Sequence, residues 1–450
     1  MHLHAGNTAH GQEDYLVGRG AAWFAFAMTF ALMLFDYIDR QVIVSLFPYI
    51  KSAWSLSDTQ LGSLVSVVSV TVALGALPVA LLADRTSRIK SIVAMATAWS
   101  LASISCMFAR NFGQLFAARA LVGVGEAGYG SVGAALIASI FPARLRGSLL
   151  AAFFAAGSLG SVIGVLLGGM IAARWGWQAA FGVVGVPGLV LALLYLKVRD
   201  YKTVALTPTL DAATGSTGSA AMFIAKALVR SRTMLWVCLG GAAQLIVVSA
   251  LWSWLPSFLN RFHGVAASQA GGRAALVVLL GAAGAVVWGS VVDRAGARRA
   301  RNKLYVMALL CIATLAVLVP TFAATQGAGL SAGSQFALIA LGGFLMTCTV
   351  GPVSAIVIDV IHPGVRATGA SVLALFQNLL GLAVGPIVTG ALSDRFGLES
   401  ALTLVPLFGA LAAAFFMLAA RTYEGDIHQV ESVPIDAAAM PSAASAAAAT

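Results

Sequence analysis

Five charged residues lie inside long apolar segments in the first half of this sequence, where a charge is costly and is usually kept for function. Asp36, Asp39 and Arg40 fall within one helical turn, and Asp36 and Arg40 share a helix face because they are four residues apart. Arg119 and Glu126 share a face of another apolar segment. A nearby arginine favours an ionised carboxylate, whereas removal from water favours the protonated form. A change in exposure can therefore load or release a proton at this group of residues.

These residues are expected to meet across one cavity, since Asp36 and Glu126 both fall near the middle of their segments. Arg40 and Arg119 both fall farther toward the same end. Proton coupling is one interpretation of the group. The alternative is a static network of buried ion pairs that only orders the helices.

The composition identifies the solvent of these segments as a lipid bilayer. Of the 450 residues 60% are hydrophobic and only 10% are charged, whereas soluble domains carry about 25% charged residues. Long unbroken apolar runs favour transmembrane helices, because a helix satisfies its own backbone in hydrocarbon. The net charge of +10 resides in short loops, so it does not indicate a nucleic-acid partner.

Twelve apolar runs each approach the ~20 residues that a membrane span requires. The first six cover residues Ala21–Phe47, Leu61–Ala83, Ser91–Ala109, Gln114–Ile140, Leu149–Ala172 and Ala179–Leu196. The second six cover Thr233–Phe258, Ala270–Val292, Leu304–Ala323, Phe336–Ile361, Gly369–Leu392 and Ala401–Ala420. The sequence therefore predicts an all-α membrane protein with two six-helix halves.

The polar segments complete the expected domain organisation. Most of the 27 lysine and arginine residues fall on the side of the bundle that carries both termini, which predicts cytoplasmic termini. The expected parts are a cytoplasmic segment 1–20, a bundle 21–198, a cytoplasmic linker with an amphipathic helix 199–232, a bundle 233–420, and a disordered cytoplasmic tail 421–450.

The halves repeat each other. Asp84-Arg85, between the second and third runs, recurs as Asp293-Arg294 at the equivalent place in the second half. Such a parallel duplication of a six-helix unit is typical of one large class of transporters. An aspartate beside basic residues at a helix end can hold neighbouring helix ends together. We therefore predict a conformational lock at Asp84, Arg85, Arg88, Asp293 and Arg294.

Several of these stretches resemble one family. The loop Ala83–Lys90 resembles the signature loop of the major facilitator superfamily, and Arg119–Ala127 resembles its Arg–x–x–x–Gly–x–Gly motif. Asp39-Arg40-Gln41 and Ser57–Gly62 are similar to the spinster-type branch, and the neighbouring organic-anion (sugar-acid) symporter branch shares the Asp-Arg pair. The fifth run lacks the proline of the drug-antiporter motif.

The resemblance implies the twelve-helix fold of that superfamily and roles for the charged residues. It implies proton carriers at Asp39 and Glu126, to which we add Asp36. It also implies gating or anion binding at Arg40 and Arg119.

The second half has no equivalent of these charges. Its candidates for substrate contact are polar or aromatic, namely Gln244, Gln377, Asn378 and Trp252, and packing is the alternative role of each. Tyr37 and Tyr129 are further candidates in the first half. The expected cavity therefore has one cationic wall, from the first half, and one weakly polar wall, from the second half. Such a cavity suits an anionic amphiphile or a small organic acid as substrate.

These observations predict a secondary transporter, coupled to protons, that moves an organic anion or a lysolipid-like amphiphile by alternating access. The alternatives are a sugar-acid or carboxylate proton symporter, then a drug efflux antiporter or a membrane sensor that transports nothing. No enzyme activity, metal or cofactor is expected, because no metal-spaced His/Cys set, nucleophile elbow or phosphate loop occurs in a suitable context. The expected partners are the substrate, protons and the lipid bilayer. The protein is expected to be a monomer and to lie in a bacterial-type inner membrane.

Overall fold

The structure is a computed structural model that describes residues 15–85, 87–198, 231–326, 330–361 and 366–431. Within these residues every regular element is a helix. Twelve helical stretches are long and apolar enough to cross a membrane. The prediction of an all-α, twelve-span membrane protein is therefore confirmed.

The first half contains six spans, built from seven helices. These are α1 (Arg19–Trp54), α2 (Asp58–Arg85), α3 (Arg88–Cys106), α4 (Phe112–Glu126), α5 (Tyr129–Ile140), α6 (Ala143–Trp175) and α7 (Trp177–Tyr195).

The second half repeats this plan with more interruptions. Its α-helices are α9 (Arg232–His263), α10 (Ala267–Gly296), α11 (Asn302–Ala323), α12 (Ala332–Met346), α13 (Val350–Asp359), α14 (Arg366–Phe376), α15 (Val384–Phe396), α16 (Leu398–Leu404) and α17 (Phe408–Glu431). Short pieces of other helix types are η1 (Ala324–Gln326), η3 (Gln377–Leu382) and η4 (Val405–Leu407).

The fourth span of each half is broken at its middle. In the first half, α4 ends at Glu126 and α5 begins at Tyr129, with Gly128 at φ 82° between them. This left-handed conformation favours glycine, which has no Cβ to clash with the backbone. In the second half, the corresponding break lies between Met346 and Val350.

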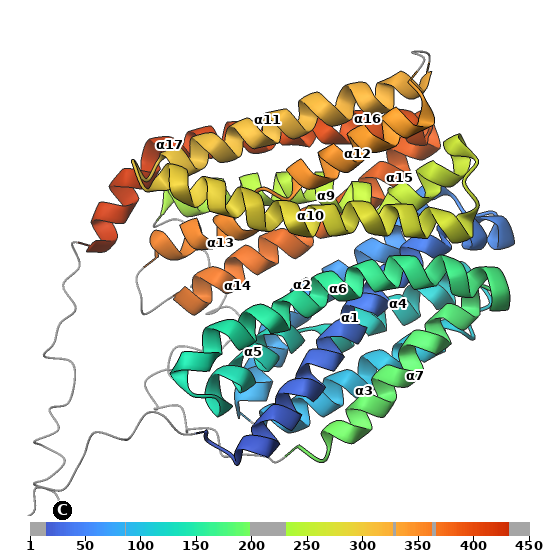
Figure 1. Cartoon of the computed structure of the whole chain (residues 1–450). Helices are drawn as coiled ribbons and strands as arrows, with labels where there is room; N and C mark the ends of the chain where they lie inside the picture. The colour runs from blue at the N-terminus through green and yellow to red at the C-terminus, as the bar shows by residue number, and fades with distance from the viewer. Residues whose placement is uncertain (1–14, 86, 199–230, 327–329, 362–365, 432–450) are drawn as a thin grey trace, which may run out of the picture.

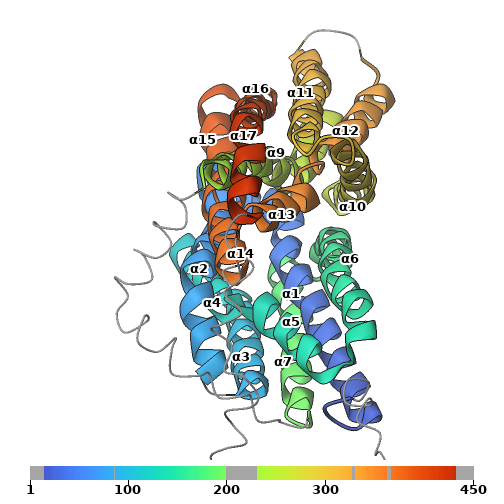
Figure 2. The same ribbon diagram turned by 90° about the vertical axis from the view of Figure 1, so that its left-hand side faces the viewer.

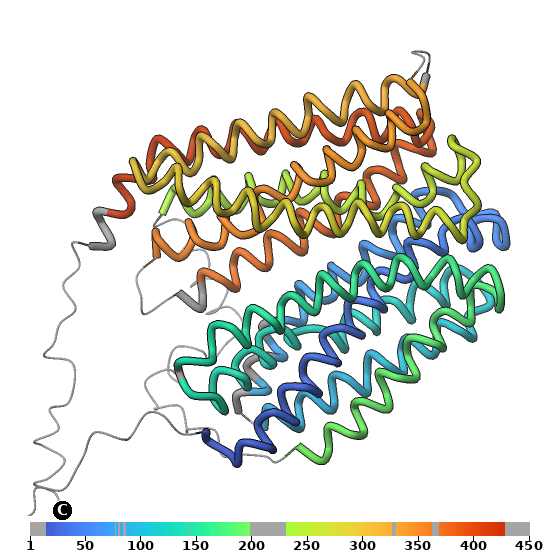
Figure 3. Tube along the Cα trace, viewed as in Figure 1, coloured from blue at the N-terminus to red at the C-terminus, as the bar shows by residue number. Residues whose placement is uncertain are grey.

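The two halves form separate bundles, one blue to green and the other yellow to red (Figure 3). We call the end of the molecule with Arg19 and Glu431 the termini side. The opposite end, with Asp58 and Ala267, is the far side. The halves lie closer together at the far side than at the termini side (Figure 1). Seen from the termini side, the second half lies above the first (Figure 2).

A row of glycines on α6 positions α1, the helix that carries three of the five buried ionisable residues. A Cβ atom on Gly164 would lie 2.6 Å from the carbonyl oxygen of Ile38, and one on Gly168 would lie 2.6 Å from that of Val42. Only glycine allows the two backbones to approach this closely. The register of α1 against α6 therefore depends on these positions.

The end of the second bundle differs from the expected domain boundary. Helix α17 continues to Glu431, whereas the sequence analysis begins a disordered tail at residue 421. Tyr423 donates to Asp359 at 2.8 Å, and Asp426 accepts from the backbone of Thr233 at 3.0 Å. These contacts with the neighbouring spans hold the extra turns in place. Most of the expected linker and the rest of the tail, residues 199–230 and 432–450, lie outside the described residues, as do residues 1–14.

Candidate functional site

The five ionisable residues of the apolar segments come together where α1 packs near α4. The structure divides them into two sets, one around Arg40 and one around Arg119. The sequence predicts that both arginines and the carboxylates meet across one cavity. It does not predict this division into two sets.

In the first set, Arg40 lies between two carboxylates. Its Nε atom is 2.9 Å from an oxygen of Glu126 and 3.5 Å from an oxygen of Asp36. The side chain of Glu126 is 0% exposed and that of Asp36 is 4% exposed, whereas Arg40 is 18% exposed. Arg40 is therefore the member of this set that solvent reaches most easily. The Arg40 guanidinium also lies 5.5 Å from the centre of the Tyr37 ring, a cation–π distance.

In the second set, Arg119 and Asp39 form a buried ion pair with side chains 1% and 2% exposed. Arg119 Nη1 lies 3.3 Å from both the carboxylate and the backbone carbonyl of Asp39. The hydroxyl of Ser103, on α3, donates to the other carboxylate oxygen. The sequence analysis missed Ser103, because a lone serine in an apolar span carries no signal of its own.

Small residues on α4 allow this helix to pack closely against α2 and α3. A Cβ on Gly125 would lie 2.5 Å from the backbone nitrogen of Trp99 on α3, and one on Gly123 would lie 2.6 Å from the carbonyl of Val68 on α2. Glu126 follows directly and ends α4 at the break. The glycines of the Arg–x–x–x–Gly–x–Gly motif are therefore packing residues that hold α4, and with it Glu126, close against α2 and α3.

Tyr129 forms its hydrogen bond outside the charge sets, among the described residues, and has a packing role. Its hydroxyl donates to the carbonyl of Thr29 at 2.7 Å, and its ring meets Trp99 edge to face at 5.1 Å between centroids. Tyr129 is 1% exposed. We therefore assign it to the core that fixes α5 against α1 and α3.

The second-half candidates do not gather into one polar cluster. Gln244 is fully buried and donates to the carbonyl of Met346 at 3.0 Å, at the end of α12. Trp252 is partly buried and packs on the core that joins α1 and α9. Gln377 and Asn378 are partly exposed and begin the π-helical segment η3. Such segments are frequent at functional sites, whereas the hydrogen bond of Gln244 to Met346 indicates a structural role.

The predicted lock residues are only partly described. The side chains of Asp84 and Arg85 lie outside the described residues. Arg88 donates to Ser139 on α5 at 2.8 Å, within the first half. Asp293 and Arg294 are exposed and form no ion pair with any other residue that the structure describes.

A network between the halves lies instead at the far side. The carboxylate of Asp394, at the end of α15, accepts from the backbone nitrogens of Asp58 and Thr59 at 2.7 and 2.8 Å. A residue of the second half thus caps the first turn of α2, where a negative charge is favourable.

Asp58 itself extends this far-side network. Its carboxylate accepts two bonds from Arg261 on α9, at 2.7 and 2.8 Å, and one from Ser393 at 2.5 Å. Lys51 lies 2.5 Å from the same carboxylate. Asp58 could be recognised from the sequence only as part of a family motif. Its contacts with Arg261 and Ser393 join residues more than 200 positions apart, and a single sequence does not reveal such pairs.

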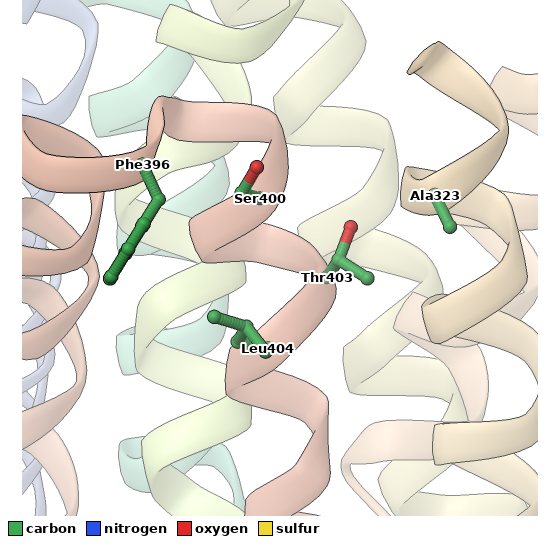
Figure 4. A pocket seen from close by; sticks show the side chains of 5 residues that line it. All are labelled: Ala323, Phe396, Ser400, Thr403 and Leu404. Atoms are coloured by element: carbon green, nitrogen blue, oxygen red, sulfur yellow. The ribbon is translucent and has the colours of Figure 1, made fainter. Parts of the chain in front are cut away.

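An open pocket of about 250 Å³ lies at the far side of the second half. Ala323, Phe396, Ser400, Thr403 and Leu404 line it (Figure 4). It contains none of the ionisable residues described above, so we do not place the substrate there. Within the described residues, no group of three or more His, Cys, Asp or Glu side chains is placed to hold a metal ion.

Two six-helix bundles with charges buried in one of them define a membrane transport protein of the duplicated type. The sequence model of the Major Facilitator Superfamily matches residues 29–386. The chain belongs to this superfamily and is a multi-pass membrane transporter.

Individual relatives fall in the two expected branches. Protein spinster homolog 3 of Danio rerio is 26% identical over 438 residues, covering 89% of this chain and 85% of that protein. The gallate transporter of Pseudomonas putida is 28% identical over 443 residues, covering 90% of this chain and 94% of that protein.

One solved structure supports the fold. It is the crystal structure of a bacterial homolog to the human lysosomal transporter Spinster, with a TM-score of 0.80 and 22% identity, covering 91% of this chain and 99% of that one. The predicted resemblance to the superfamily and to its spinster-like branch is confirmed.

Proposed function

We propose that this transporter couples proton movement to the transport of an organic anion or a lysolipid-like amphiphile across a bacterial-type inner membrane. The observation that carries the proposal is the Arg40 set. A partly exposed arginine contacts two buried carboxylates, so an anion that binds Arg40 competes with those carboxylates for the same positive charge. Protonation of a carboxylate relieves that competition, which links substrate binding to proton uptake.

The second half supports an amphiphilic or weakly polar substrate. Trp252, Gln377 and Asn378 are the second-half candidates with partial exposure, and none of them carries a charge. A carboxylate or phosphate on the substrate would pair with Arg40, and an apolar part would lie against Trp252. Among the relatives, the gallate transporter is named for a small aromatic carboxylate, which is an organic anion.

The membrane orientation follows from charge. The excess of lysine and arginine on the termini side favours cytoplasmic termini. With that orientation, the far-side contacts of Asp58 and Asp394 support an inward-facing state, with the outer ends of the halves held together. Alternating access then requires these contacts to break. Since one chain carries both halves, the proposed transport unit is a monomer.

Reconstituted protein tests both the coupling and the substrate class. Proteoliposomes with an imposed proton gradient would be offered gallate, galactonate and a lysophospholipid. We expect wild type to accumulate at least one probe, and Glu126→Gln to lose gradient-driven accumulation while it keeps exchange. Accumulation by Glu126→Gln at the wild-type level would refute the assignment of Glu126. Binding of a probe with neither flux nor exchange would instead support a sensor.

A small-carboxylate proton symporter is the second candidate, favoured by the similarity to the gallate transporter over 90% of this chain. Uptake of gallate or galactonate, unaffected by an excess of lysophospholipid, would select this candidate.

A further inference from the structure

The two sets of buried charges differ in how completely their carboxylates are paired. Asp39 accepts from Ser103 on one oxygen and from Arg119 on the other. One aspartate faces one arginine, so this set is electrically balanced as it stands. Both oxygens of the Asp39 carboxylate therefore have a hydrogen-bond donor.

The Arg40 set is not balanced. Two buried carboxylates, Asp36 and Glu126, share the single guanidinium of Arg40. Arg40 Nε, both oxygens of Glu126 and one oxygen of Asp36 are buried without a well-directed hydrogen bond among the residues that the structure describes, although the ions lie close together. Two buried carboxylates that share one site cannot both ionise without a large electrostatic cost.

Other groups near this set do not remove the imbalance. The charged neighbours are Asp39 and Arg119, which neutralise each other. The remaining titratable neighbours are the phenols Tyr37 and Tyr129. Arg40 is thus the cation available to both carboxylates.

We infer that Asp36 and Glu126 together hold one transported proton, and that Asp39 is a positioning residue that stays ionised. The inference rests on the proposed proton coupling. It assigns the second carboxylate of the coupling site to Asp36, whereas the family resemblance implies Asp39.

The chemical step is a simple proton transfer. A proton from water on one side of the membrane forms an O–H bond with a carboxyl oxygen of Asp36 or Glu126. That hydroxyl can donate to the neighbouring carboxylate, and the remaining charge of −1 is balanced by Arg40. When the site opens to the other side the O–H bond breaks, and the proton returns to water there.

Infrared difference spectroscopy tests the inference without any substrate. Purified protein in lipid is titrated with acid and base, and the C=O stretching band of protonated carboxylic acids is recorded. We expect a band that appears on acidification and disappears on alkalinisation in wild type. The band should be lost in both Asp36→Asn and Glu126→Gln, because a single remaining carboxylate is balanced by Arg40 and stays ionised.

Two comparison variants complete the experiment. Asp39→Asn should retain the band, and so should Asp359→Asn, a control carboxylate on α13 that binds Lys303 and Tyr423. Thermal unfolding identifies any variant that fails to fold. If Asp36→Asn does not fold, Asp36→Glu replaces it, and we then expect the C=O band to remain but to shift in frequency. A band that persists in Asp36→Asn, or that disappears in Asp39→Asn, would overturn the inference.

Transport separates this inference from the proposed function. Asp36→Asn should lose gradient-driven accumulation of the probe that wild type accumulates, while it keeps exchange. If Asp36→Asn accumulates like wild type, the shared proton is wrong and the proposed function stands. If wild type accumulates no probe but the infrared pattern is as expected, the proposed coupling fails and the shared proton site remains supported.

Discussion

At the residue scale, the five charged residues of the site form two sets that differ in burial and in their ion-pair partners. Arg119 and Asp39 are almost fully buried and make a direct pair, with Ser103 completing the contacts of the aspartate. Arg40 is partly exposed and contacts two carboxylates. The first set is suited to hold α1, α3 and α4 together, and the second is suited to change its partners.

Removal of Arg119 should therefore reduce stability far more than a surface substitution does. Arg119→Leu leaves the Asp39 carboxylate buried without its cation, which typically costs about 3–5 kcal/mol. We expect a clearly lower thermal unfolding temperature for the purified protein in lipid. The double variant Arg119→Leu/Asp39→Asn should recover most of the loss. A double variant no more stable than Arg119→Leu would contradict this role for the pair.

At the element scale, the position of α1 depends on α6. The backbones of these helices touch along a row of glycines, with Gly164 facing the carbonyl of Ile38. Asp36 and Arg40 lie on either side of Ile38, so the same contact sets the depth of both side chains.

Gly164→Ala should therefore disturb the site as well as the packing. The new Cβ would lie 2.6 Å from the Ile38 carbonyl oxygen, and the helices must separate, at a cost of about 1–3 kcal/mol. We expect a lower unfolding temperature and weaker proton-driven uptake in proteoliposomes. Gly147→Ala on the same helix is the matched control, because nothing lies within 4 Å of its Cβ position. Equal effects of the two substitutions would exclude this explanation.

Much of the fold could be predicted from the sequence, because apolar length alone specifies a membrane span. The charged residues of the site were also evident, since charge in hydrocarbon is rare. The pairing of Arg40 with Glu126 and of Arg119 with Asp39 was not, because it depends on how α1 and α4 rotate against each other. The extension of α17 past residue 420 depends on Asp359 and Thr233, partners that no local pattern reveals.

At the scale of the whole molecule, the far-side network joins the halves. Asp394 of the second half caps the first turn of α2, and Asp58 of the first half binds Arg261 of α9. These charge-assisted bonds favour the state in which the far side is closed.

Asp394→Ala should shift the balance between conformations. Loss of a helix cap costs about 0.5–2 kcal/mol, and 1.4 kcal/mol is about a tenfold change in a population ratio. Spin labels at the exposed positions Arg110 and Gly333 would report the far-side distance, with a larger share of long distances expected. Glu399→Ala is the control, because within the described chain its carboxylate contacts no residue of the first half. An unchanged distance distribution in Asp394→Ala would show that other contacts hold the far side closed.

The location of every buried ion pair of the site in the first half has a practical consequence for protein engineering. In the proposed mechanism, the first half supplies the proton site and Arg40 for the anionic group of the cargo, and the second half supplies the contacts with the rest of the cargo. Libraries restricted to α9, η3 and the neighbouring helices can therefore be screened for new cargo while the ion-driven step is left intact. A chimera that joins the first half of this chain to the second half of a relative is the direct way to exploit this separation.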